Sequence, residues 1–224
     1  ADVAPLINDP NDPHRPRTRL VCIENTSNRG GGSVWDIEEV RRIKALCGER
    51  GLALHVDGAR IFNAMAVDGT RPALADSLSV CLSKGLGAPV GSVLIGPAAF
   101  IQESRRVRKR WGGGMRQAGI LAAAASYALD QHVQRLPEDH AHAALLGQAL
   151  ARTPLVAEVL PVTTNIVICR TRAADGAGAL LALLRERGVL ATAFGADQVR
   201  LVTHLDVDRE AVERVVHLIN SLPA

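Results

Sequence analysis

The stretch Leu82-Ser83-Lys84-Gly85-Leu86-Gly87-Ala88-Pro89-Val90-Gly91 joins two apolar segments, one ending at Leu82 and one covering Val93 to Ile95. Its three glycines indicate a tight, irregular turn between two strands. A lysine at the end of a buried strand is easily desolvated. Desolvation lowers the pKa of a lysine and exposes a nucleophilic amine, as a Schiff-base lysine requires. The competing interpretation of Lys84 is an ordinary solvated charge in a loop.

A second motif of this kind lies upstream. Asp57 follows the apolar run Leu52-Ala53-Leu54-His55-Val56 and precedes Gly58-Ala59-Arg60. In open α/β sheets, ligands bind outside the carboxyl ends of the strands. An aspartate and a lysine at two such ends suit pyridoxal 5'-phosphate, because the carboxylate keeps the pyridine nitrogen protonated and the lysine bonds to the aldehyde. The alternative for Asp57 is the N-cap of a short helix predicted over 61–67.

A change in composition at Pro137 divides the chain into two predicted domains, 1–136 and 137–224. Strands alternate with helices in the first domain, which predicts a mainly parallel α/β sheet. The strands of this domain are expected at 20–24, 52–56, 77–82 and 92–96. Its helices are expected at 36–50, 61–67, 97–110 and 116–136. The second has the pattern of a small α+β domain; its helices are expected at 138–151, 178–187 and 208–221, and its strands at 156–160, 165–169, 189–193 and 198–203.

Composition excludes several classes of protein. The 224 residues carry a net charge of only +3, which is too mild to indicate nucleic-acid binding. The basic cluster at 105–110 is either a solvated helix face or part of a site. No apolar run approaches the roughly 18 residues of a membrane span. The four cysteines are scattered without a C-x-x-C pair, which is typical of buried free thiols in a reducing cytoplasm. No metal site is predicted.

Several segments together resemble the low-specificity L-threonine aldolases, which are pyridoxal-phosphate enzymes of the aspartate-aminotransferase fold; the segments are 24–26, 55–64, 81–92, 108–109, 112–117 and 200–205. The resemblance runs from about His14 to the C-terminus. It implies a cofactor-binding large domain that is incomplete at its N-terminus, followed by the small domain. Members of the family carry a preceding segment with a phosphate-binding cup, a histidine that stacks on the cofactor and an N-terminal arm. The chain therefore resembles the C-terminal portion of such an enzyme.

The resemblance assigns roles to four residues near the predicted strand ends. Lys84 would bond to the cofactor, and Asp57 would pair with its ring nitrogen. Arg60 would reach the ring hydroxyl and the substrate, although it could instead pair with Asp57. Arg200 would bind the substrate's carboxylate as a bidentate fork; its alternative is an outward-facing, solvated strand arginine.

Other assignments from the resemblance are weaker. His14 corresponds to a histidine that approaches the β-hydroxyl of the substrate, but it could equally be an exposed loop residue. Lys109 and Arg116 resemble residues that reach a neighbouring subunit's cofactor pocket, or they are ordinary basic residues. Asn165 is either a site residue or a turn residue. Ser27 departs from the family, which has histidine there, and this puts the local polar network in doubt.

The function implied is pyridoxal-phosphate-dependent cleavage of L-threonine, L-allo-threonine and related β-hydroxy-α-amino acids to glycine and an aldehyde. The alternatives are a related β-eliminating lyase or aminotransferase of the same fold, or a catalytically incomplete chain. The resemblance also implies a cytoplasmic homotetramer, or dimer, whose subunits share active sites. Partners other than the small-molecule substrate, such as nucleic acid or a membrane, are not expected.

Overall fold

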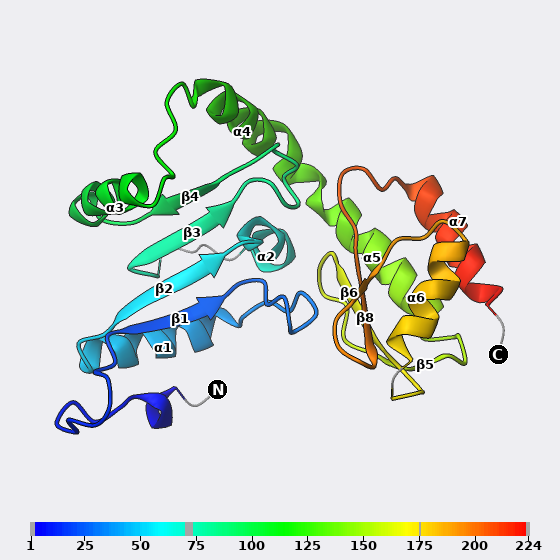
Figure 1. Ribbon diagram of the computed structural model, residues 1–224, viewed down its shortest axis with the longest axis horizontal. Coiled ribbons are helices and arrows are strands. Elements are labelled where there is room, and N and C mark those ends of the chain that lie inside the picture. The colour runs from blue at the N-terminus through cyan, green and yellow to red at the C-terminus, as the bar shows by residue number, and fades with distance from the viewer. Residues whose placement is uncertain (1–2, 70–73, 175, 223–224) are drawn as a thin grey trace.

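The computed structural model describes residues 3–69, 74–174 and 176–222 (Figure 1). These residues form two four-stranded sheets, with strand orders β1-β2-β3-β4 and β5-β6-β8-β7. The arrowheads of β1, β2 and β3 in Figure 1 point toward the second sheet and its helices. The carboxyl ends of the first sheet therefore face the second domain.

The first sheet is mainly parallel, as predicted. Strands β1 (Leu20–Glu24), β2 (Ala53–Gly58) and β3 (Ser77–Cys81) run parallel, and β4 (Ser92–Ile95) is antiparallel to β3. Asp36 caps α1 (Ile37–Glu49) by accepting hydrogen bonds from the backbone N–H groups of Glu38 and Glu39. The remaining helices of this half are η1 (Ala4–Leu6), α2 (Ile61–Asp68), α3 (Ala98–Arg110) and α4 (Gly119–His132).

The second sheet is antiparallel throughout. Its strands are β5 (Val156–Val159), β6 (Ile166–Thr171), β7 (Thr192–Ala193) and β8 (Gln198–Val202). Helices α5 (Leu136–Leu150), α6 (Ala177–Glu186) and α7 (Arg209–Asn220) supply the rest of its core, which is built from aliphatic side chains such as those at 167, 180, 199 and 212. The α+β pattern expected for this half is confirmed.

Most element boundaries differ from the sequence prediction by one or two residues, and two elements differ by more. The helix predicted over 116–136 is α4 followed by a 3-10 turn, η2 (Val133–Arg135), and α5 then begins at Leu136 with Pro137 in its first turn, where a proline is tolerated. The strand predicted over 189–193 shrinks to β7, because the N–H of Val189 bonds to the carbonyl of Leu184 and so closes the end of α6. The predicted domain boundary falls at the start of α5.

A loop of the first half is tied to the second. The carbonyl of Gly32 accepts hydrogen bonds from Thr163 Oγ1 (3.1 Å) and Thr164 Oγ1 (2.7 Å). Gly32 has a φ of +79°, and a Cβ added there would lie 2.3 Å from Thr164 Oγ1. Only glycine satisfies both the backbone conformation and this close approach.

One side of the first domain is apolar and exposed. Strand β4 is exposed along its whole length, and α3 has no buried residue. Trp111 and Ile120 expose 85% and 82% of their surface. We call this surface the apolar face; its large side chains are Val93, Ile95, Phe100, Trp111, Ile120 and Tyr127. Exposed apolar surface of this extent is typical of an interface.

Candidate active site

A cavity of about 420 Å³ brings together segments of both domains. One wall is the loop after β3, which carries Lys84, together with Arg60 at the start of α2. Residues of the second domain, before β6 and after β8, form the other wall. The lining residues are Arg60, Ser83, Lys84, Gly85, Gly87, Ala88, Asn165, Val202, His204, Leu205 and Asp206.

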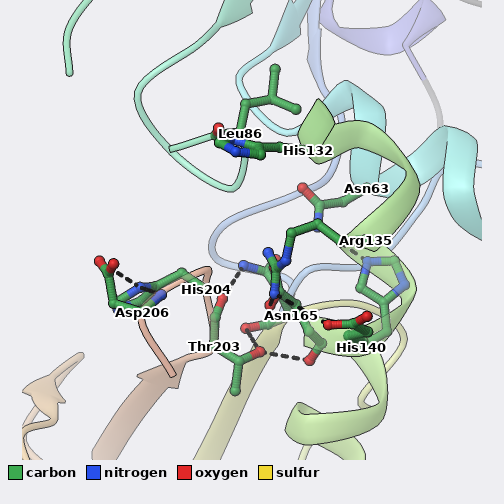
Figure 2. A network of polar contacts seen from close by, with 11 residues as sticks. Asn63, Leu86, His132, Arg135, His140, Asn165, Thr203, His204 and Asp206 are labelled. Atoms are coloured by element: carbon green, nitrogen blue, oxygen red, sulfur yellow. Dashed lines mark hydrogen bonds and ion pairs between the residues drawn. The ribbon is translucent and has the colours of Figure 1, made fainter. Parts of the chain in front are cut away.

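The Lys84 loop is held by short hydrogen bonds. The N–H of Gly87 donates to the carbonyl of Lys84 (2.9 Å), and His132 Nδ1 donates to the carbonyl of Leu86 (2.6 Å; Figure 2). Gly87 has a φ of +68°, which favours glycine. The expected desolvation of Lys84 is not observed: its side chain is exposed, although Gly85 and Leu86 next to it are buried.

Asp57 lies near the carboxyl end of β2, opposite Glu24 on β1 and Ser79 on β3. Its Oδ1 accepts hydrogen bonds from the backbone N–H of Ala59 (3.1 Å) and from Ser79 Oγ (3.4 Å). The alternative that Asp57 caps α2 is wrong, because that helix begins after Arg60 without a side-chain cap. Asp57 is exposed and does not belong to the cavity lining.

Arg60 and Arg200 form a cationic pair between the domains. Burial and the charge of Arg200 lower the pKa of Arg60, while the carboxylates of Glu24 and Asp57 act in the opposite direction. Arg200 Nη1 donates to Asn28 Oδ1 (2.7 Å), and its guanidinium lies 4.9 Å from the centre of the Phe194 ring. Arg200 is therefore not the outward-facing, solvated arginine of the alternative interpretation.

Two buried polar atoms near this pair have no hydrogen-bond partner among the described residues. One is Arg200 Nε, and the other is Oδ1 of Asn165, a residue that lines the cavity and is 2% exposed. Asn165 is held through its other side-chain atom, Nδ2, which donates to the carbonyl of Thr203 (2.9 Å; Figure 2). An unsatisfied buried polar atom is costly unless a ligand or water completes it.

Besides Asp57 and Arg200, three predicted site residues are absent from the lining of this cavity. His14 is exposed and belongs to the segment that leads into the amino end of β1; part of this segment lines a separate cavity of about 890 Å³ with residues 50–53. Lys109 lies in the last turn of α3, and Arg116 follows that helix. Both side chains are exposed. None of the three lines the cavity that contains Lys84.

The structure adds residues that sequence reasoning did not select. His204 and Asp206 line the cavity, and His132 supports the Lys84 loop from α4. His204 lies within the segment 200–205 that resembles the aldolases. Because it is a titratable residue four positions after Arg200, the sequence could have identified it as a site residue. No pattern in the sequence pointed to His132, because its contact depends on how α4 packs against a loop 46 residues earlier.

Neither a metal-binding cluster nor a membrane-spanning helix occurs in the part of the chain that the structure describes. No group of three or more His, Cys, Asp or Glu side chains there could hold a metal ion. None of the helices within that part has the length and apolar character needed to cross a membrane.

Comparison with known proteins agrees with this architecture. The chain is 46% identical over 210 residues to the low specificity L-threonine aldolase of Escherichia coli K12, covering 92% of this chain and 61% of that protein. It therefore spans less than two thirds of this relative's length.

Two solved structures share the fold. A Leishmania major threonine aldolase matches with a TM-score of 0.73 at 21% identity, covering 93% of this chain and 62% of that one. An N-acetylornithine aminotransferase from Stenotrophomonas maltophilia matches with a TM-score of 0.66 at 21% identity, covering 91% and 55%. These likenesses confirm the predicted aminotransferase-like fold. Residues 1–174 match the family model described as beta-eliminating lyase, and the chain belongs to that family.

Proposed function

We propose that this chain forms most of a pyridoxal-phosphate-dependent aldehyde-lyase that cleaves L-threonine, L-allo-threonine and related β-hydroxy-α-amino acids to glycine and an aldehyde. The observation that supports the proposal best is that one cavity contains both Lys84 and Arg60. The similarity to a low specificity L-threonine aldolase across 92% of the chain points to the same reaction.

The residues present fit the cofactor. Lys84 offers an exposed amine within a cavity, as an aldehyde requires. Asp57 offers a carboxylate at the carboxyl end of the adjacent strand, suited to a protonated ring nitrogen. The unpartnered Arg200 Nε and Asn165 Oδ1 are buried polar atoms of the kind that a bound polar molecule satisfies.

Each residue has a distinct role in this proposal. Lys84 holds the cofactor, which when bound supplies an electron sink for the bond that breaks at Cα. Asp57 keeps the proton on the ring nitrogen. Arg200 binds the substrate's carboxylate, and Arg60 adds a second positive charge beside it. Together they orient the Cα–Cβ bond, because fixing reactants in one geometry removes much of the entropic barrier.

The proposal extends to assembly and location. The apolar face would pack against a second copy of the chain in a dimer or tetramer, and Lys109 and Arg116 at its edge would reach the partner's cofactor pocket. This arrangement explains why both side chains are exposed and absent from their own subunit's cavity. His14 would act in catalysis only if it, too, reached the cofactor pocket of a partner. We place the enzyme in the cytoplasm.

The test is a product analysis. The full chain is incubated with pyridoxal phosphate and L-threonine, and acetaldehyde is measured by enzymatic reduction while glycine is measured by chromatography. Equal amounts of the two products are expected, and Lys84→Ala should form neither. Release of ammonia with a 2-oxo acid would instead identify an eliminating lyase. Amino-group transfer to an added 2-oxo acid would identify an aminotransferase.

A further inference from the structure

The cavity contains one imidazole among its lining residues, that of His204. His204 lies just after β8 and begins a turn in which the N–H of Val207 donates to its carbonyl (2.9 Å). Its side chain is 45% exposed. Histidine is the side chain that most often transfers protons in enzymes, so a half-exposed imidazole in this cavity is a candidate for proton transfer.

The backbone at His204 is held firmly on both sides. Thr203, the preceding residue, is 1% exposed, and its Oγ1 donates to the carbonyl of Asp139 (2.6 Å; Figure 2). Its N–H donates to the carbonyl of Asn165 (3.0 Å). On the other side, Leu205 Cδ2 would lie 3.0 Å from a Cβ placed on Gly87. His204 is therefore fixed next to the loop that carries Lys84.

The surroundings of the ring suit both neutral tautomers of His204. The backbone N–H of Asp206 donates to Nδ1 (3.3 Å), which satisfies Nδ1 when it carries no proton. The Asp206 carboxylate lies 3.5 Å from the same atom and accepts when Nδ1 is protonated (Figure 2). Nε2 has no hydrogen-bond partner within the described ranges 3–69, 74–174 and 176–222. The free nitrogen can therefore carry a proton or accept one.

We propose that His204 is the residue that takes the proton from the substrate's β-hydroxyl. The inference rests on the proposed function. Nε2 accepts the hydroxyl proton while Nδ1–H faces Asp206. The hydroxyl oxygen then forms the carbonyl of the aldehyde, and the Cα–Cβ electron pair stays with Cα, where a proton completes glycine. The charged groups that share the cavity with His204 are Asp206, Arg60 and Lys84. Of these, Lys84 is committed to the cofactor.

Two variants separate this role from a structural one. His204→Asn keeps an acceptor near the position of Nδ1, so the hydrogen bond from the Asp206 N–H can form, but it removes Nε2. His204→Ala opens space for added imidazole. His217→Asn is the matched control, because His217 is an exposed histidine on α7 outside the cavity. Circular dichroism and thermal unfolding establish that each variant folds.

The assay compares two reactions of the same site in the full chain loaded with pyridoxal phosphate. Threonine cleavage requires removal of the hydroxyl proton, whereas exchange of the α-hydrogens of glycine with deuterated water does not. His204→Asn should lower kcat for threonine by about 10²-fold or more, the usual effect of general acid–base catalysis, with glycine exchange nearly unchanged. Added imidazole should restore part of the rate of His204→Ala.

A spectroscopic readout does not depend on turnover. The imidazole nitrogens of His204 are followed by ¹⁵N NMR, with His204→Asn to assign them. L-Serine, which carries a β-hydroxyl, should shift the Nε2 resonance, and glycine should not. Equal losses in both reactions, or no NMR shift and no rescue, would overturn the role of His204 alone. A wild-type chain that exchanges glycine hydrogens but releases no aldehyde would overturn the proposed function and this inference together.

Discussion

Arg60, at the start of α2, and Arg200, on β8, lie close enough that the charge of Arg200 is the largest cause, after burial, of the lowered pKa of Arg60. Guanidinium groups stay protonated in proteins, so the pair is dicationic at neutral pH. Two like charges between domains repel each other unless an anion lies near both. The carboxylates of Glu24 and Asp57 act on Arg60 in this sense, and in the proposed function the substrate's carboxylate would be a further anion beside the pair.

The first prediction concerns the identity of the cofactor lysine. The chain has three lysines, Lys44, Lys84 and Lys109. Borohydride reduction after addition of pyridoxal phosphate should label the tryptic peptide that contains Lys84, as mass spectrometry can show. Lys44 is engaged with Asp76 (2.5 Å) and should stay unlabelled. Label found chiefly on Lys44 or Lys109 would disprove the assignment.

The second prediction concerns Asp57. Asp57→Ala removes the anionic partner of the cofactor's ring nitrogen, so turnover of L-threonine should fall by at least about 10²-fold, the scale of losing one electrostatic contact to a transition state. Glu213→Ala provides an acidic control, because that carboxylate is 58% exposed on α7 and does not line the cavity. It should lose less activity. Near-normal turnover in Asp57→Ala would remove the residue from the mechanism.

The third prediction concerns Arg200. Arg200→Lys keeps the charge but loses the planar fork, so KM for threonine should rise by about 10- to 100-fold, as expected when a hydrogen bond between charged groups worth about 1.5–3 kcal/mol is lost. Cofactor binding, followed by absorbance, should stay the same. Arg170→Lys, at a half-exposed arginine on β6 that pairs with Glu158, is the matched control. An unchanged KM would mean that the carboxylate is bound elsewhere.

The fourth prediction concerns shared active sites. If Arg116 serves a partner's pocket, Arg116→Ala and Lys84→Ala should each be inactive alone, and mixed subunits should regain activity. Random pairing in a two-fold dimer leaves about a quarter of the sites intact. Refolding the two variants together and assaying aldehyde release measures this fraction. A mixture as inactive as its components, or a monomer by analytical ultracentrifugation, would contradict the shared site.

The fifth prediction concerns the thiols. Burial raises the pKa of Cys169 to about 11. Because its native pKa lies above the ordinary value of 9.0, the unfolded chain loses the proton first, and stability should fall as pH rises from about 9 to 11, by at most about 3 kcal/mol. Urea unfolding of wild type and Cys169→Ala at several pH values measures this slope; a slope equal in both would refute the assignment. Cys22 is exposed, contrary to the buried thiols predicted.

Residues that end an apolar run in the sequence were the easiest to predict. Lys84 and Asp57 stand out because each ends an apolar run and precedes glycine, and both lie at carboxyl ends of the first sheet as that pattern requires. The exposure of Lys84 was not predictable, since it depends on the packing of the loop, which buries Gly85 and Leu86 but not Lys84. His204 gained importance only when Thr203 and Leu205 were seen to fix it next to that loop.

Contacts between distant segments could not be derived from local pattern. The approach of Arg200 to Arg60 depends on how the two domains pack, and neither hydrophobic periodicity nor spacing encodes that packing. The same holds for His132, whose bond to the Leu86 carbonyl is set by the path of α4. His14 shows the converse: a motif resemblance selected it, but the fold places it outside the cavity.

The loop between β1 and α1 is bonded to the second domain at two places besides the chain through η2: Gly32 accepts from Thr163 and Thr164, and Asn28 accepts from Arg200. Attachments at separate points oppose relative rotation of the domains more than the chain connection alone would. Replacing Gly32 with alanine would place a Cβ 2.3 Å from Thr164 Oγ1 and so disturb one of these attachments without changing any residue that lines the cavity.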